Sequence, residues 1–211
     1  MFATLEMNRA VVSDPVTETD EDLFLRFRDT GDRDAFEQLV HRYERELFSY
    51  LRRYLGDAEM AEDAFQAAFT QVYVKRAQFE EGRKFRPWLY AVATNQAIDS
   101  QRRNRRHKAI SLDRKNSTSE SDAGKLVDLL VSNVPDPAAS ADHLEQGEMV
   151  RKLIGQLPEN YRQLIHMIYY QGLKYSEVAE ALQVPTGTIK SRMHSAVLKL
   201  TELWNKSHSE A

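Results

Sequence analysis

The sequence predicts an all-α protein with two helical domains joined by a flexible acidic linker. Apolar residues recur at three- and four-residue steps through most of the chain, which is the spacing of helices with one buried face. No strand-type alternation and no internal repeat accompany them. Changes in composition and charge divide the chain into an acidic tail, a first domain, a linker, a second domain and a short tail, at residues 1–22, 23–108, 109–146, 147–206 and 207–211.

Overall composition restricts the classes of protein to consider. The chain has 211 residues, a formal net charge of −3 and no cysteine. The lack of cysteine excludes disulfides, Cys-ligated zinc, iron–sulfur clusters and thiol nucleophiles, and it fits a reducing cytoplasm. The longest apolar stretch, Leu164–Tyr170, is far shorter than the roughly 20 residues that cross a bilayer. Because no signal peptide is visible either, we expect a cytoplasmic protein without membrane insertion.

Three long helices are expected in the first domain. The apolar face of the first covers residues 36–54, and the second spans 58 to about 77. A polar loop at 80–84 precedes the third, for which Pro87 suits the first turn. The third helix ends in residues 101–108, where five of eight residues are basic and none is acidic. The tail before this domain holds six acids, one base and no periodic pattern, so we expect it to be solvated.

Four helices are expected in the second domain, after the linker. Between residues 111 and 145 the chain holds seven acidic and three basic residues, a net charge of −4, and we expect this segment to be extended. Only 125–131 has the pattern for a helical turn or two. Apolar positions place the helices of the second domain at 149–157, 164–168, 176–182 and from 185 onward, with Ser176 as the cap of the third.

The sharpest local signal is a helix-turn-helix pattern at residues 175–200. A short helix, a tight turn and a second helix follow one another at the spacing of this motif, with the small Ala179 where the helices cross. Residues 185–199 contain no acid, which suits a helix that lies against DNA phosphates. A helical hairpin that only packs is the alternative. The outward face of the last helix offers these candidate DNA-binding residues: Thr186, Thr188, Lys190, Ser191, Arg192, His194 and Ser195.

A second signal is the stretch 79–108, which is rich in aromatic and basic residues. Aromatic rings beside cations suit a surface that stacks exposed bases and follows a nucleic-acid backbone. The cations between Arg102 and Lys108 repel one another unless a polyanion is present. The aromatic residues could equally form the core of a helical domain, and for Trp88 and Leu89 we favour the core.

An acidic cluster is the third signal, formed around the start of the second helix by Asp57, Glu59, Glu62 and Asp63. Acids stabilise a helix N-terminus, which explains two of them. The same patch could dock a basic partner surface, and the residues alone leave both interpretations open. An enzyme is disfavoured, because the six histidines have no metal-ligand spacing and no phosphate-binding, zinc-protease or nucleophile motif occurs. We therefore expect no catalytic residue, no metal and no cofactor.

Both halves, in this order, resemble an RNA polymerase sigma factor of the extracytoplasmic-function (ECF) type in the sigma-70 family. The resemblance covers 23–108 (region two) and 147–204 (region four). It rests on FEQLVHRYERELFSYLRRYLGDAEMAEDAFQAAF and FRPWLYAVATNQAIDSQRRNRR in the first half, and on LPENYRQLIHMIYYQGLKYSEVAEALQVPTGTIKSRMHSAVLKL in the second. It implies a subunit that binds the β′ and β subunits of core RNA polymerase, recognises the −35 and −10 elements of promoter DNA and promotes melting. A stand-alone helix-turn-helix regulator is the alternative.

The resemblance also implies roles for individual residues. The outward face of the last helix would read the −35 element. An anti-sigma factor is a possible further partner, and the family usually has an acid where this chain has Ala67. Core polymerase binding would fall on Asp57, Glu62, Asp63, Gln66 and Phe69. Recognition of the −10 element would fall on Phe79, Arg83, Lys84, Phe85, Arg86, Asn95, Asp99, Arg102, Arg103 and Arg106.

Overall fold

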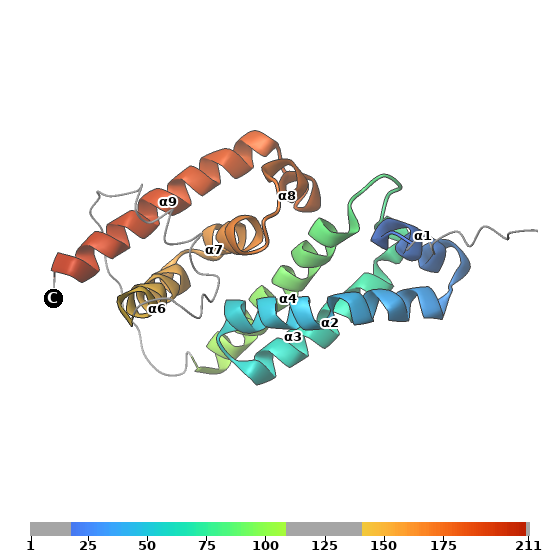
Figure 1. The fold of residues 1–211 in the computed structure, drawn as a ribbon, viewed down its shortest axis with the longest axis horizontal. Helices are drawn as coiled ribbons and strands as arrows, with labels where there is room; N and C mark the ends of the chain where they lie inside the picture. The colour runs from blue at the N-terminus through green and yellow to red at the C-terminus, as the bar shows by residue number, and fades with distance from the viewer. Residues whose placement is uncertain (1–17, 109–140, 210–211) are drawn as a thin grey trace, which may run out of the picture.

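The computed structural model describes residues 18–108 and 141–209, and all regular elements in these two ranges are helical (Figure 1). The first domain consists of α1 (Asp20–Thr30), α2 (Arg33–Leu55), α3 (Ala58–Val74), a short 3-10 turn (Arg76–Gln78) and α4 (Phe85–Lys108). The second consists of α6 (Ala141–Gln156), α7 (Glu159–Ile165), a π-helical turn (His166–Tyr170), α8 (Tyr175–Ala181) and α9 (Thr186–Ser209). The predicted all-α class with two helical domains is confirmed.

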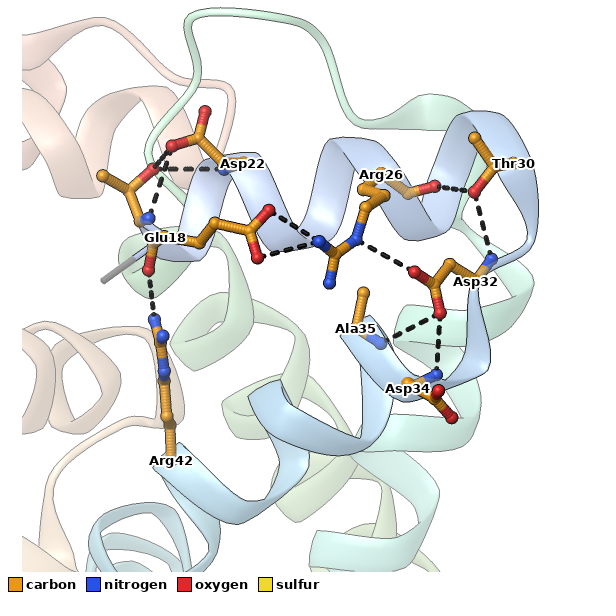
Figure 2. A network of polar contacts seen from close by, with 9 residues as sticks. Glu18, Asp22, Arg26, Thr30, Asp32, Asp34, Ala35 and Arg42 are labelled. Atoms are coloured by element: carbon orange, nitrogen blue, oxygen red, sulfur yellow. Dashed lines mark hydrogen bonds and ion pairs between the residues drawn. The ribbon is translucent and has the colours of Figure 1, made fainter. Parts of the chain in front are cut away.

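The first helix begins inside the segment that we expected to be a tail. Thr19 and Asp22 form a capping box, in which the Asp22 amide donates to Thr19 Oγ1 at 3.1 Å. Arg26 pairs with Glu18 at 2.7 Å and with Asp32, the N-cap of α2, at 3.0 Å, as Figure 2 shows. The prediction of a solvated tail is therefore wrong for its C-terminal end. The remainder of that tail lies outside the described residues.

Helices α1 to α4 enclose an aromatic core. The ring of Phe24 in α1 lies 4.8 Å from the rings of Phe79 and Phe85 and 5.3 Å from that of Trp88. All four side chains are buried, so they hold the loop between the 3-10 turn and α4 against α1. Helix α4 begins at Phe85, slightly earlier than Pro87 suggested, and its first amide donates to the Glu21 carboxylate at 3.0 Å.

Helices α6 to α9 form a second core, built on the apolar positions that the sequence pattern selected. Three boundaries differ from the prediction. Helix α7 begins at Glu159, five residues before the apolar positions 164–168 that marked it. Helix α6 begins at Ala141, within the segment expected to be linker, and α8 begins at Tyr175 rather than being capped by Ser176. The Glu177 carboxylate accepts from the Lys174 amide at 2.8 Å and fixes the start of α8. The segment 125–131 lies outside the described ranges.

The two domains pack against each other, with α7, the π-helical turn and α8 facing α2 and α4 (Figure 1). His166 from the π-helical turn lies at the centre of this contact. Its ring centroid is 4.7 Å from that of Tyr54 and 6.0 Å from that of Tyr50, both on α2. All three side chains are buried, so the interface between the domains is itself a small aromatic core. None of the helices that the structure describes is long and apolar enough to cross a membrane.

Candidate nucleic-acid interface

Helices α8 and α9 form the expected helix-turn-helix. The turn between them places Gln183 in the left-handed region at φ 54°, and the Val184 amide donates to Ala179 O at 3.0 Å. Ile189 and Met193 are buried and fix α9 on the second domain. A helix held in this way presents its opposite face as a rigid unit, which is what a major groove requires.

The predicted DNA-binding residues of α9 divide into two groups. Thr186, Lys190, Ser191 and His194 are exposed, whereas Thr188, Arg192 and Ser195 are half-buried. The exposed group combines hydroxyls with a cation, which can bond base edges and neutralise phosphates. Among the half-buried residues, Arg192 does not simply face solvent. It lines a cavity of about 360 Å³ between the domains, together with Arg83, Asn95 and other residues of both.

The predicted DNA-binding surface of the first domain is engaged by the second domain. Arg83 donates to the backbone carbonyls of Glu180 and Ala181, at 3.0 and 3.3 Å. Arg86 donates to the backbone carbonyl of Gln171 at 3.1 Å. Both guanidinium groups are half-buried, so helix α8 and the turn before it cover the loop and the first turn of α4.

Residues further along α4 also contact the second domain. Asn95 accepts from Gln163 Nε2 at 3.4 Å, and Arg102 pairs with Glu159 at 2.8 Å. Four of the ten residues proposed to bind the −10 element, at positions 83, 86, 95 and 102, therefore contact the second domain. Polar groups that could bond a DNA strand instead bond helix α7, the segment after it and α8.

The other proposed −10 residues have different surroundings. Lys84 is exposed and lies 3.8 Å from the Glu21 carboxylate, and Asp99 and Arg103 are exposed. Phe79 and Phe85 are 1% and 0% exposed, and their rings belong to the aromatic core around Phe24. We therefore correct the expectation that these two rings contact bases, because the apolar core holds them. The side chain of Arg106 lies outside the described residues.

The acidic cluster borders a groove of about 740 Å³ between α3 and α4. Asp57, the N-cap of α3, lines it together with Asp63 and Gln66 of α3, and Arg103 lines it from α4. Ala67 lines it as well. The Asp57 carboxylate also accepts from the Met60 amide at 2.9 Å, so this residue acts as an N-cap whatever else it binds. A groove with carboxylates on one wall suits a basic partner.

Two further residues of the proposed polymerase contact lie apart from that groove. Glu62 accepts from Gln66 Nε2 at 3.1 Å and is exposed. Phe69 is only 7% exposed, and its ring lies 5.1 Å from that of Phe65 and 6.1 Å from that of Phe36. We therefore correct the assignment of Phe69 to a surface contact, since its role in this structure is to pack α3 on α2.

Sequence reasoning missed His166 as a residue of interest. It is buried, and burial together with the positive charges of Arg162 and Arg53 lowers its pKa to about 3. The ring is therefore neutral at any ordinary pH and packs as an aromatic group. Within the described ranges, no group of His, Asp and Glu side chains could hold a metal ion.

Comparison with known proteins decides the family. Residues 39–107 match the family model for Sigma-70 region 2, and residues 147–200 match that for Sigma-70, region 4. The ECF RNA polymerase sigma factor SigW of Bacillus subtilis is 32% identical over 164 residues, which are 78% of this chain and 86% of SigW. The chain belongs to the ECF family of RNA polymerase sigma factors.

Two solved structures share the fold of this sigma factor. The structure of CnrH in complex with the cytosolic domain of CnrY matches at a TM-score of 0.60 and 21% identity, over 90% of this chain and 99% of that one. The sigma factor RpoE from Bartonella quintana, in complex with the anti-sigma factor NepR, matches at 0.56 and 23%, over 81% of this chain and 96% of that one. At these identities the likeness shows the fold alone.

Membership of the family establishes the general function. A sigma factor binds core RNA polymerase and recognises promoter DNA, and the protein is a regulator of transcription initiation, with no catalytic activity indicated. The region-two match begins at residue 39, whereas the helical domain begins at Asp20, so α1 and the start of α2 lie outside that match.

Proposed function

We propose that this sigma factor reads the −35 element with α9, contacts the −10 element with the basic surface of α4, and docks on core polymerase through the groove between α3 and α4. The observation that carries the proposal is the helix-turn-helix, which leaves Thr186, Lys190 and Ser191 exposed at the start of α9. No acid occurs between residues 185 and 199 to repel phosphate. Each good base contact from such a face contributes about 1–3 kcal/mol of discrimination.

The −10 surface must be uncovered before it can bind DNA. Arg83 and Arg86 donate to carbonyls of the second domain, and a DNA phosphate or base would have to replace those acceptors. We infer that the free chain binds promoter DNA weakly and that docking on core polymerase separates the two domains. The linker, with a net charge of −4 between residues 111 and 145, would then bridge two bodies held apart by polymerase.

The polymerase contact centres on Asp63 and Gln66 in this proposal, and the exposed Glu62, which lies outside the groove, is held by Gln66. Asp57 contributes as the N-cap of α3, and Ala67 supplies none of the charge that relatives usually have at its position. A basic segment of the large polymerase subunits could bind these carboxylates at the protein surface, without disrupting the hydrophobic core of the first domain. Because exposed carboxylates act over about one Debye length, the contact should weaken as salt rises.

A protein that silences this sigma factor is a further proposed partner. RpoE of Bartonella quintana is found in complex with an anti-sigma factor. A comparable regulator would act on this chain by holding the domains together or by covering the groove between α3 and α4. The protein would carry out these steps in the cytoplasm, without a cofactor, a metal or a catalytic residue.

Promoter-dependent transcription tests the proposal. Promoters are first selected from a genomic fragment library with the full chain and core polymerase, and run-off transcripts are then measured from them. We expect transcripts only when both components are present, and little DNA binding by the chain alone. If the chain instead binds duplex DNA tightly without polymerase and yields no transcript with it, the proposal is replaced by a stand-alone helix-turn-helix regulator.

A further inference from the structure

A cavity of about 720 Å³ lies between the end of α2 and helices α6 and α7. Five cationic side chains line it, and no Asp or Glu does: Arg52, Arg53, Arg151, Lys152 and Arg162. The first two belong to the first domain and the other three to the second. The cavity therefore exists only while the two domains are packed together.

Within the described ranges, no carboxylate forms an ion pair with any of these cations. Among the residues that the structure describes, none of the five lies within 4.0 Å of a carboxylate, whereas Arg26, Arg42, Arg86 and Arg102 all form ion pairs. Arg151 donates to the carbonyl of Gly147 at 3.2 Å, and that acceptor is neutral. Like charges that converge without an anion repel one another, so the wall of the cavity attracts negative charge.

Arg162 is the most unusual of the five. It is only 4% exposed, and its polar partners are the neutral Gln101 side chain and the Gly155 carbonyl. Its guanidinium lies 4.9 Å from the Tyr54 ring centroid, and its buried Nε has no hydrogen-bond partner in the described structure. A buried cation of this kind is costly unless an anion compensates it.

Side chains next to the cavity lie in the same positive electrostatic potential. Arg53 lies over the Tyr170 ring at 4.9 Å, and the buried Tyr170 hydroxyl has no hydrogen-bond partner among the described residues. The lowered pKa of His166 has Arg162 and Arg53 among its causes, after burial. The field therefore extends across both domains.

We propose that this cavity binds a small polyphosphorylated ligand, of the class of free triphosphate or a nucleoside triphosphate, which bridges the two domains. Ligand pockets commonly measure about 300–1,000 Å³, and this one is large for a single phosphate group. Cations distributed over three helices suit a chain of phosphates, each of which can accept charge-assisted hydrogen bonds. Because the ligand would need both domains, it would stabilise the packed arrangement and oppose promoter binding; this consequence rests on the proposed function.

Calorimetric titration of the full chain tests the site itself. Inorganic triphosphate, ATP and GTP are titrated separately at about 0.15 M salt, where exposed charges are already screened. Stronger binding of a nucleotide than of triphosphate would place the base in the site, and equal binding would identify the phosphates alone as the ligand chemistry. We expect R52Q/K152Q to bind at least about tenfold more weakly, since it removes two exposed cations from opposite domains.

The double variant R33Q/R45Q is the matched control. It makes the same change of net charge at exposed positions of α2 that do not line the cavity, and it should bind like the unmodified chain. Thermal melting shows that both variants fold. Absence of binding by the unmodified chain, or equal binding by the two double variants, overturns the proposal.

The bridging role has its own readout. Because the chain has no cysteine, Q38C/K174C places one dye at an exposed position of each domain. Single-molecule energy transfer should show the ligand increasing the population with packed domains. Binding by calorimetry with no change in that population overturns the bridging role. Neither experiment uses transcription, so its failure is distinguishable from failure of the proposed promoter function.

Discussion

The two proposed DNA-binding surfaces of this sigma factor differ in their availability. At the start of α9, Thr186, Lys190 and Ser191 are exposed. On α4 and the loop before it, Arg83 and Arg86 are half-buried against the second domain. The difference teaches that the two surfaces need not be available at the same time. The recognition helix is exposed in the free chain, whereas the second domain covers the proposed surface for melted DNA.

The largest expected effect comes from destroying the second domain while leaving the first intact. Ile189 is fully buried, so I189D places a charge in that core and should destabilise it by about 3–5 kcal/mol. We expect loss of −35 duplex binding together with a gain of binding to a single-stranded −10 oligonucleotide. Hydrogen exchange identifies which domain has unfolded, and fluorescence anisotropy measures both DNA affinities. Loss of both would show that the second domain does not cover the −10 surface.

Single substitutions in the proposed −35 surface and in the proposed polymerase groove should impair different functions. Lys190→Ala should weaken −35 recognition by about 1–3 kcal/mol in the holoenzyme, and Asp63→Ala should weaken core polymerase binding instead. Arg192→Ala should also weaken −35 recognition, although its side chain lines the cavity between the domains. Footprinting and polymerase titration measure the two properties. Indistinguishable phenotypes for Lys190→Ala and Asp63→Ala would contradict the division of labour.

Acid should destabilise the packed arrangement through His166. Its pKa is about 3 in the folded chain and about 6.5 when unfolded, so between these values the unfolded chain binds the extra proton. The free energy of unfolding should therefore fall by up to about 1.4 kcal/mol per pH unit as the pH drops below 6.5. Above pH 6.5 the contribution of His166 to this free energy does not change with pH. Urea unfolding at pH 7.0 and 5.5 measures the loss. His166→Asn cannot titrate and should show a smaller loss, and equal losses would mean that other groups dominate.

The smallest effect is expected from a single polar contact between the domains. The Arg102–Glu159 pair is partly exposed, so Glu159→Gln should weaken the packing by no more than about 1 kcal/mol. Binding of a single-stranded −10 oligonucleotide by the free chain should rise by up to about fivefold, while −35 binding should stay unchanged. Anisotropy titration resolves such a difference. A fall in −10 binding would mean that Glu159 supports the DNA-binding surface rather than covering it.

The sequence pattern was most informative where burial is periodic. The apolar steps of α2, α3 and α9 follow directly from helices with one buried face, so these helices were predicted. Helix α1 was missed because its start is rich in acids, and its signal is the capping box of Thr19 and Asp22. The rings of Phe79, in the loop before α4, and of Phe85, at the start of α4, were misassigned, because an aromatic residue beside cations suits either a core or a stacked base. Burial of both rings decides for the core.

Contacts between the domains could not be predicted from the sequence. Arg83, Arg86 and Arg102 bond carbonyls or carboxylates that lie 57 or more residues away in the chain. No local pattern encodes such pairings, because they depend on how two separate cores dock. His166 is the one local hint, since a titratable residue in the most apolar stretch of the chain needs an enclosed aromatic environment or a polar partner.

Energy transfer between dyes on the two domains tests the central claim most directly. The Q38C/K174C chain is labelled and measured alone and then with a saturating amount of core polymerase. We predict high transfer in the free chain and a large decrease when polymerase binds, because docking must uncover the −10 surface. The same efficiency in both states would contradict the account.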